Sequence, residues 1–284
     1  MQKKSFLFAV LLFPLLATCA SGADAPADAP APKAKGPHYI VYLLAGQSNM
    51  DGRGKVKDLH GPLEPYAKPL PGVLIHFSAG GLRRPLLQNE GFDPLHPGCS
   101  ESPKTFGPEL GFGHAMLAAA PDEKILLVKF AEGGTSLVAD WTLSDPKKLY
   151  AGFIHFVKAT ERKITDEGAD YEIRGMLWMQ GEGDAGPKDN GYKKLLTELI
   201  AQTRADLNLP QLPFVIGQVY DNGRRNFVIF DEKAVAKEVP FTAFVESDGL
   251  KTWDHGTHFD AASQIELGKR FAREMLKLAP PVKK

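Results

Sequence analysis

The chain has 284 residues, of which 43% are hydrophobic and 24% are charged, and its 34 Lys and Arg residues balance its 34 Asp and Glu residues. This length and composition are typical of one globular domain with a substantial core. The balanced charge, without any Lys/Arg-rich block, argues against nucleic acid or an anionic membrane surface as a partner and favours a neutral or carbohydrate-like small molecule.

The first 25 residues have the layout of a secretory signal peptide: two lysines, an apolar run from Phe6 to Ala17, and then small residues. This run is too short for a comfortable membrane span, which takes about 20 apolar residues. The stretch Leu16-Ala17-Thr18-Cys19 also resembles a bacterial lipoprotein cleavage site, although threonine departs from the usual Gly, Ala or Ser. We expect a secreted or periplasmic bacterial protein, with lipid attachment at Cys19 as the weaker alternative. The one other cysteine, Cys99, leaves no disulfide framework to build.

The Ala- and Pro-rich stretch of residues 23–36 has no apolar periodicity, so we expect a linker over residues 26–37 and one folded domain over residues 38–280. Five short apolar segments bounded by Gly, Pro or Asp are predicted to be buried parallel strands: residues 39–45, 124–130, 172–179, 213–219 and 241–245. Four longer segments with apolar residues three and four apart are predicted helices: residues 108–120, 146–167, 191–207 and 261–278.

Strands that alternate with helices predict a three-layer α/β/α arrangement around a mainly parallel, five-stranded sheet. Residues 52–107 are rich in Gly and Pro and are expected to form a long, irregular insertion near one edge of this sheet, with one candidate strand at residues 72–77. Ligands of such sheets bind at the carboxyl ends of the strands. Unusual polar segments stand at those ends: GQSNMDG, AEGGTSLVADW and QGEGDAG follow the first three strands, and WDHGTHFD precedes the last helix.

Ser48 has two interpretations from its own segment. It could cap a helix, or it could be a nucleophile if a histidine takes its proton and hydrogen-bond donors stabilise an oxyanion. His258 lies just before the last helix, so its loop ends at the same sheet edge as Ser48, which favours a general base. The Gly133-Gly134 pair allows a backbone N–H to approach a substrate oxygen. The side-chain amide of Gln180 could be a further donor or could only fix its loop.

Taken in order, these motifs resemble the SGNH-hydrolase superfamily, and within it the sialate O-acetylesterase and acetylxylan esterase branch, carbohydrate esterase family six. The resemblance rests on GQSNM at residues 46–50, GGTS at 133–136, WMQGEGD at 178–184 and the His258-Phe259 segment, and it spans about residues 38–276. GQSNM together with WxQGExD is specific, whereas GGTS alone is a weak signal.

The resemblance implies a flavodoxin-like sandwich and a serine esterase, without metal or cofactor, that removes O-acetyl groups from a carbohydrate such as acetylated xylan or sialic acid. It implies that Ser48 is the nucleophile and His258 the general base. The implied oxyanion donors are the backbone N–H of Ser48, a glycine of the Gly133-Gly134 pair, and Gln180. The eight histidines show no paired ligand spacing, which also argues against a metal site.

The acid of the implied triad is left open. The superfamily usually has it three residues before the histidine, where this chain has His255, with Asp254 one position further back. In some members of the branch the role is given to the glutamate of the QGE motif, here Glu182. Any carboxylate that orients the imidazole would serve, and we slightly favour Asp254.

Gln47, Asn49 and Trp141 are the predicted substrate contacts, with core packing as the alternative for Trp141. Asp184 is expected to fix the QGE loop. Two other functions compete with the acetylesterase: a lipid or thioester acyl hydrolase of the same fold, and a glycan-binding module without activity. The polar, Gly/Pro-rich insertion argues against the first, and the presence of both Ser48 and His258 argues against the second.

Overall fold

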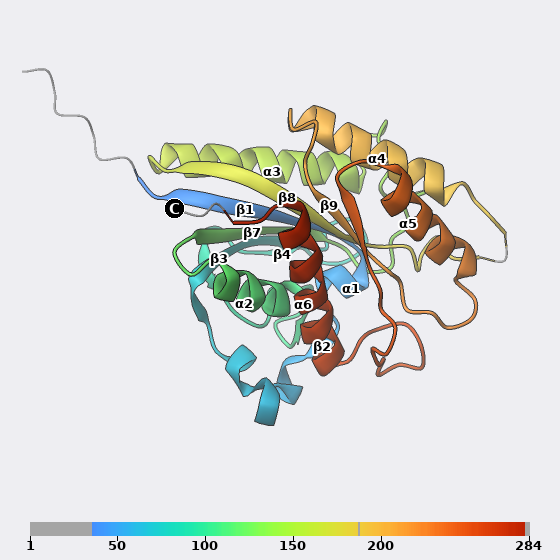
Figure 1. Ribbon diagram of the computed structural model, residues 1–284, viewed down its shortest axis with the longest axis horizontal. Helices are drawn as coiled ribbons and strands as arrows, with labels where there is room; N and C mark the ends of the chain where they lie inside the picture. Colours follow the sequence, from blue (N-terminus) through green and yellow to red (C-terminus); the bar gives the residue numbers. More distant parts are fainter. Residues whose placement is uncertain (1–35, 187, 282–284) are drawn as a thin grey trace, which may run out of the picture. The chain divides into compact units, whose positions relative to one another are not determined.

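The computed structural model describes residues 36–186 and 188–281, so the predicted signal peptide and nearly all of the predicted linker lie outside the described residues. The described residues form one large sheet between two layers of helices (Figure 1). Helices α2 (Glu109–Ala119) and α6 (Ala261–Leu278) cover one face of this sheet. Helices α3 (Leu149–Asp166), α4 (Tyr192–Asp206) and α5 (Asn226–Glu238) cover the other face.

The sheet has the strand order β10-β9-β8-β1-β7-β3-β4, and β5 pairs with β3 outside this path. Six strands run parallel: β1 (His38–Gly46), β3 (Leu70–Ala79), β7 (Lys124–Ala131), β8 (Asp170–Met179), β9 (Phe214–Gly217) and β10 (Thr242–Val245). The short β4 (Leu87–Gln88) and β5 (Asp93–Leu95) are antiparallel to β3. Helices cover both faces, so the central strands are apolar in nearly every position, as in β1, which is buried from Ile40 to Gly46.

The predicted fold class is confirmed, and the insertion adds strands at the edge where it was expected. The five predicted strands alone stand in the order β7-β1-β8-β9-β10, which is the flavodoxin order. The candidate strand at residues 72–77 is part of β3, which widens the sheet next to β7. The rest of the insertion holds β2 (Gly54–Lys55), β6 (Thr105–Phe106) and the 3₁₀ segments Val56–Asp58 and Gly61–Ala67.

All four predicted helices are present, and α5 is an additional one. Its apolar run FVIF, residues 227–230, is continuous and therefore lacks the helical spacing of three and four. Within it Val228 and Ile229 face the core, whereas Phe227 and Phe230 are exposed. The helix has one buried and one exposed face in the structure, although the spacing of its apolar residues does not predict these faces.

Helices α2 and α6 approach each other unusually closely because glycines meet at their crossing. A Cβ added at Gly268 would come within 2.1 Å of the carbonyl oxygen of Pro108, and one at Gly111 within 2.1 Å of the carbonyl oxygen of Ile265. Asp260 starts α6 as an N-cap, because its side chain accepts a hydrogen bond from the Ser263 N–H at 2.8 Å. The close packing and the cap together fix α6, and with it the loop that holds His258.

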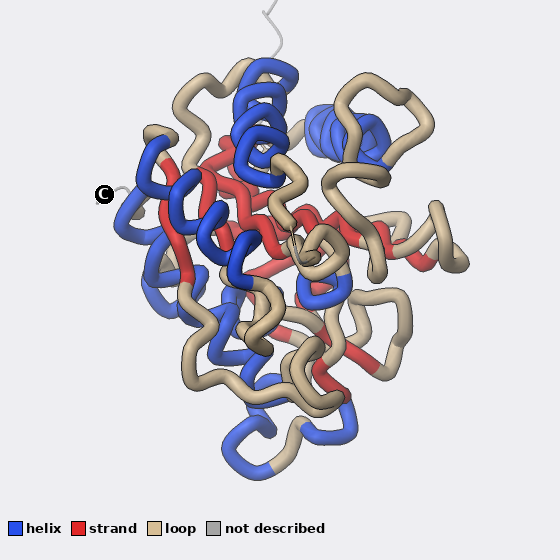
Figure 2. Tube along the Cα trace, turned by 90° about the vertical axis from the view of Figure 1, so that its right-hand side faces the viewer, coloured by secondary structure: helices blue, strands red, loops and turns tan. Residues whose placement is uncertain are grey.

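The carboxyl ends of the parallel strands share one edge, which Figure 2 views from the front. Loops and the short helix α1 (Ser48–Asp51) lie at this edge. No helix among residues 36–186 and 188–281 is both long enough and apolar enough to cross a membrane.

Candidate active site

Ser48 is the first residue of α1, directly after β1 and Gln47, and it is almost fully buried. Its side chain does not cap the helix. Instead its Oγ lies 3.1 Å from Nε2 of His258, which is 210 residues further along the chain. The structure therefore brings together the two side chains that the sequence analysis singled out first.

The second nitrogen of the imidazole contacts a carboxylate. Nδ1 of His258 lies 2.5 Å from Oδ2 of Asp254. An ionised carboxylate can only accept hydrogen bonds, so Nδ1 carries the proton and donates it to Asp254. Nε2 is then left with its lone pair directed at the hydroxyl of Ser48, which is the arrangement that a general base requires.

Backbone N–H groups hold Asp254 in place. Its Oδ1 accepts hydrogen bonds from the N–H of Thr257 at 3.1 Å and from the N–H of His258 at 2.7 Å. Burial raises the pKa of Asp254, but these hydrogen bonds and the neighbouring imidazole outweigh that effect, so its pKa lies below the ordinary value. The carboxyl group is thus kept ionised beside His258.

Glu182, the other predicted acid, is directed at a different partner. Its Oε1 accepts a hydrogen bond from Nδ2 of Asn49 at 2.6 Å, and its Oε2 has no hydrogen-bond partner within the described part of the chain. The Oε2 atom is buried, and burial raises the pKa of the Glu182 carboxyl group above its ordinary value. A raised pKa is the opposite of what an acid facing an imidazolium needs.

The side chain of Asn49 is fully buried, which argues against its predicted role as a substrate contact. Besides Glu182, its Nδ2 donates to the carbonyl oxygen of Thr257 at 2.9 Å. Its Oδ1 accepts a hydrogen bond from the Phe259 N–H at 3.2 Å. Asn49 therefore connects α1 to the QGE loop and to both sides of His258, and it acts as a connector between segments.

The surroundings of Gln180 argue against the prediction that its amide is an oxyanion donor. The side chain is fully buried, and its Nε2 donates to Asp184 at 2.6 Å, to Gln47 at 3.1 Å and to the carbonyl oxygen of Thr135 at 3.3 Å. With its donors engaged away from solvent, Gln180 fixes its loop. Asp184 also accepts the N–H of Leu137 at 2.7 Å, as expected for a residue that braces this region.

The two glycines of the GGTS turn differ in what their N–H groups do. The Gly133 N–H donates to Oε1 of Glu101 at 2.5 Å. Gly134 is exposed at a positive φ of 74°, and its N–H makes no hydrogen bond within residues 36–186 and 188–281. The N–H of Ser48 likewise has no acceptor among those residues. The N–H groups of Ser48 and Gly134 are therefore the ones available to a substrate oxygen.

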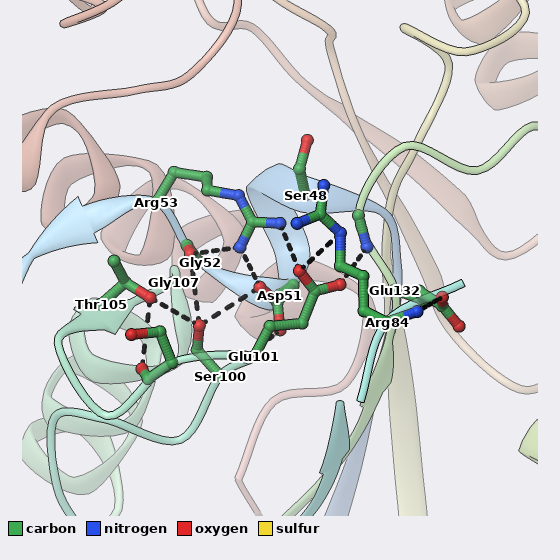
Figure 3. A network of polar contacts seen from close by, with 12 residues as sticks. Ser48, Asp51, Gly52, Arg53, Arg84, Ser100, Glu101, Thr105, Gly107 and Glu132 are labelled. Carbon is green, nitrogen blue, oxygen red and sulfur yellow. Dashed lines mark hydrogen bonds and ion pairs between the residues drawn. The ribbon is translucent and has the colours of Figure 1, made fainter. Parts of the chain in front are cut away.

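Glu101, which the sequence analysis missed, belongs to an ionic network behind the nucleophile turn (Figure 3). Its Oε2 pairs with Arg53 at 2.8 Å and with Arg84 at 3.1 Å. Arg53 also pairs with Asp51 at the end of α1, and Asp51 accepts the backbone N–H of Glu101 at 2.8 Å. Burial raises the pKa of Asp51 to about 6. The network connects α1 to the turn that begins at Gly133.

The Arg53 side chain lies so close to the turn that its present position requires a glycine at residue 133. A Cβ at Gly133 would lie 2.2 Å from Nη2 of Arg53. Any side chain there would displace the guanidinium that pairs with Glu101.

A fully buried ion pair between Lys129 and Glu109 also contacts the end of α1. Nζ of Lys129, on β7, donates to Glu109 at 2.9 Å and to the carbonyl oxygens of Asp51 at 2.5 Å and Cys99 at 2.6 Å. All three hydrogens of the ammonium group are thus used. The signal for this role was a lysine inside the apolar strand KILLVKFA, since lysine is almost never buried without partners.

Two further predicted substrate contacts, Gln47 and Trp141, are buried, which argues against a contact with substrate. Oε1 of Gln47 accepts the backbone N–H groups of Gly181 at 3.3 Å and Gly183 at 3.1 Å, so this side chain shapes the QGE loop. Trp141 is 1% exposed and packs edge-on against Trp178 in the core. The alternative of core packing holds for Trp141.

The chemistry that the site can perform is proton transfer and nucleophilic attack by Ser48. Among the residues that the structure describes, no three His, Cys, Asp or Glu side chains are grouped so that they could hold a metal ion. The site consists of a hydroxyl, an imidazole, a carboxylate and open backbone N–H groups, which are the parts of a serine hydrolase.

Comparisons with known proteins agree with this description. Residues 38–277 match the family model described as carbohydrate esterase, sialic acid-specific acetylesterase. A curated relative, the probable carbohydrate esterase At4g34215 from Arabidopsis thaliana, is 29% identical over 247 residues, which are 84% of this chain and 91% of the relative.

Solved structures resemble the fold over most of the chain. The crystal structure of the Arabidopsis thaliana protein has a TM-score of 0.64 at 26% identity and covers 85% of this chain and 99% of its own. NanS has a TM-score of 0.61 at 18% identity, with 84% and 97% of the two chains covered. A carbohydrate acetylesterase from Xanthomonas citri has a TM-score of 0.61 at 19% identity and covers 84% of this chain and 56% of its own. The chain belongs to the carbohydrate esterase family of sialic acid-specific acetylesterases.

Proposed function

We propose that this carbohydrate esterase is a serine O-acetylesterase in which Ser48, His258 and Asp254 form the catalytic triad. The observation that carries the proposal is the unbroken chain of contacts from Ser48 Oγ to His258 Nε2 at 3.1 Å and from His258 Nδ1 to Asp254 Oδ2 at 2.5 Å. Asp254 holds the imidazole in the tautomer that can accept the serine proton and stabilises the imidazolium that forms.

In the first half-reaction, Oγ of Ser48 attacks the acetyl carbonyl carbon while Nε2 of His258 takes the hydroxyl proton. The electron pair of the carbonyl bond moves to its oxygen and gives a tetrahedral oxyanion. As this collapses, the bond between the carbonyl carbon and the sugar oxygen breaks, and His258 gives its proton to that oxygen. The sugar leaves as an alcohol, and acetyl-Ser48 remains.

In the second half-reaction, His258 takes a proton from water, whose oxygen attacks the acetyl-Ser48 carbonyl. The second oxyanion collapses, the bond from the carbonyl carbon to Ser48 Oγ breaks, and His258 returns the proton to the serine. Acetate leaves. We assign the oxyanion in both steps to the N–H groups of Ser48 and Gly134, and such a donor is typically worth about 10²- to 10³-fold in rate.

A carbohydrate acetate is the substrate class that the comparisons support. The family description names sialic acid-specific acetylesterases, and the Xanthomonas citri neighbour is titled a carbohydrate acetylesterase. Within this class we propose an O-acetylated sugar unit, either of sialic acid or of a polysaccharide such as xylan.

The test is the hydrolysis of acetylated methyl glycosides and of p-nitrophenyl acetate by Ser48→Ala. We expect kcat to fall by at least about 10³-fold, because removal of any triad member leaves only the contribution of the oxyanion donors and of binding. Ser144→Ala is the matched control, since Ser144 is exposed and makes no hydrogen bond within the described residues. Undiminished turnover by Ser48→Ala would contradict the proposal. Comparison of acetyl with octanoyl esters separates it from a lipid acyl hydrolase.

Export is a second part of the proposal, and it is supported by the leader-like composition of the first 25 residues. We propose that the mature enzyme is secreted or periplasmic. Fractionation of expressing bacterial cells, followed by mass determination of the mature protein, tests this. A protein that keeps residues 1–25 in the cytoplasm would contradict export, and a lipid mass on Cys19 would identify the lipoprotein alternative.

A further inference from the structure

Trp253 is an exposed aromatic side chain beside the proposed base. The sequence has three tryptophans, and Trp141 and Trp178 are buried, whereas Trp253 is 45% exposed. It directly precedes Asp254, and its ring lies nearly parallel to the imidazole of His258, with an angle of 22° and 5.9 Å between ring centroids. A large apolar surface is therefore open to solvent next to the reacting atoms.

Trp253 is held in position by two hydrogen bonds, one from its indole and one from its backbone. Its Nε1 donates to the carbonyl oxygen of Arg53 at 3.1 Å, and the Trp253 backbone N–H donates to the carbonyl oxygen of His258 at 3.1 Å. Arg53 is itself fixed by Asp51 and Glu101. A surface that is already ordered loses little conformational entropy when a ligand stacks on it.

The Trp253 ring already has a positively charged neighbour. Nζ of Lys55 lies 4.4 Å from the centroid of the Trp253 ring. At this distance the ring quadrupole attracts the positive charge of the ammonium group. The C–H groups on one face of a pyranose ring carry partial positive charge and suit the same face.

We propose that Trp253 is the platform on which the sugar ring of the acetylated substrate stacks, in place of the Lys55 ammonium. The inference rests on the proposed function and adds to it the group that distinguishes a sugar acetate from a simple acetate ester. A lysine side chain on the surface turns aside readily, whereas the indole stays fixed by the hydrogen bond from its Nε1 to the carbonyl oxygen of Arg53. Stacking there holds the acetylated sugar against the edge of the sheet where Ser48 and His258 meet.

The test compares two acetyl esters, an acetylated methyl xyloside and ethyl acetate, which has no ring. For Trp253→Ala we expect KM for the xyloside to rise about tenfold, as for the loss of an aromatic stacking partner, with kcat changed by less than about threefold. Ethyl acetate should be hydrolysed at nearly the wild-type rate. Trp253→Phe keeps a smaller aromatic face and should recover most of the affinity, and thermal unfolding verifies that each variant is folded.

Binding without turnover gives an independent measurement. In Ser48→Ala, titration with the acetylated xyloside should change the tryptophan fluorescence, because Trp253 is the exposed tryptophan. The change should be absent in the Ser48→Ala/Trp253→Ala double variant.

Two results would overturn the platform. If Trp253→Ala lowers kcat equally on both esters, the indole acts only by positioning His258. If KM for the xyloside stays at the wild-type value, the sugar stacks elsewhere or nowhere. Wild-type enzyme that hydrolyses ethyl acetate but no sugar acetate would instead refute the proposed function, and the platform with it, before any variant is compared.

Discussion

Replacement of Asp254 by asparagine separates the role of this carboxylate from that of Glu182. In Asp254→Asn the oxygen that accepts the Thr257 and His258 N–H groups can be kept, so the loop should hold its conformation. The amide NH₂ then faces Nδ1 of His258, across a contact of 2.5 Å in the wild type. Two donors cannot share that contact, so the imidazole must carry its proton on Nε2.

That change of tautomer removes the general base. Nε2 faces Ser48 at 3.1 Å, and once it carries a proton it can no longer accept the one from the serine hydroxyl. In serine proteases the same exchange lowers kcat by about 10⁴-fold. We expect a loss of about 10³- to 10⁴-fold here, which corresponds to roughly 4 to 5.5 kcal/mol of transition-state stabilisation at 1.36 kcal/mol per factor of ten.

Glu182→Gln is the matched control. Gln keeps an oxygen that can accept the Asn49 amide at the 2.6 Å contact, and the substitution breaks no hydrogen bond at Oε2, which has no partner within the described part of the chain. We expect its kcat to stay within about tenfold of wild type. The assay is kcat for p-nitrophenyl acetate hydrolysis, with folding verified by circular dichroism. A 10³-fold loss in Glu182→Gln together with a nearly active Asp254→Asn would refute the reasoning.

Three further predictions concern the residues around the triad. Lys129→Met should lower the free energy of unfolding by about 3–5 kcal/mol, because it leaves Glu109 buried without its cation, and a Glu109→Gln/Lys129→Met double variant should recover part of this loss in urea unfolding. The pKa of Asp51 is raised from 3.8 to about 6, so its protonated carboxyl group contributes fully to stability below pH 3.8, and this contribution of about 3 kcal/mol is lost as the pH rises through 6. Asp51→Asn should remove this pH dependence of the free energy of unfolding, which denaturation curves at pH 4 and pH 7 measure. Glu101→Gln must direct its NH₂ at either the Gly133 N–H or the two guanidinium groups, so kcat for acetyl esters should fall about 10- to 100-fold at nearly constant KM.

The sheet and its order could be predicted because buried strands have a clear signal in the sequence. Apolar runs that end at Gly or at a polar turn gave five strands and four helices near their observed positions, and the flavodoxin order followed from the resemblance. Helix α5 could not be found in the same way, since its FVIF run has no helical period and its exposed Phe227 and Phe230 hide the buried face. The extent of β3 was also hidden, because pairing with β7 organises a segment rich in Gly and Pro.

The contacts that join Ser48, His258 and Asp254 could be predicted because these residues combine chemical type with a place at the strand ends. The polar residues around them could not be assigned from type alone. Gln47, Asn49 and Gln180 all stand just after the ends of strands, and each of their amides makes a hydrogen bond to a backbone group of a neighbouring loop. A sequence does not tell in which direction an amide side chain points.

Residues that act across long separations were missed for a related reason. Glu101 meets Gly133 from within the irregular insertion, and its own segment carries no periodic signal. Trp253 was passed over in favour of Trp141, although both follow a strand and only solvent exposure distinguishes them. Such pairings arise from the folded chain and require coordinates.

The spacing of the acid and the histidine shows how the loop adapts to an extra residue. Asp254 precedes His258 by four positions, one more than is usual for the superfamily. The chain absorbs the addition in a tight turn, with His255 and Gly256 at positive φ values of 63° and 115°. In this turn Oδ1 of Asp254 accepts the Thr257 and His258 N–H groups at its far end, and Oδ2 contacts the imidazole. The contact between carboxylate and Nδ1 is therefore compatible with one residue more between them than is usual, because His255 near the start of the turn adopts the left-handed conformation.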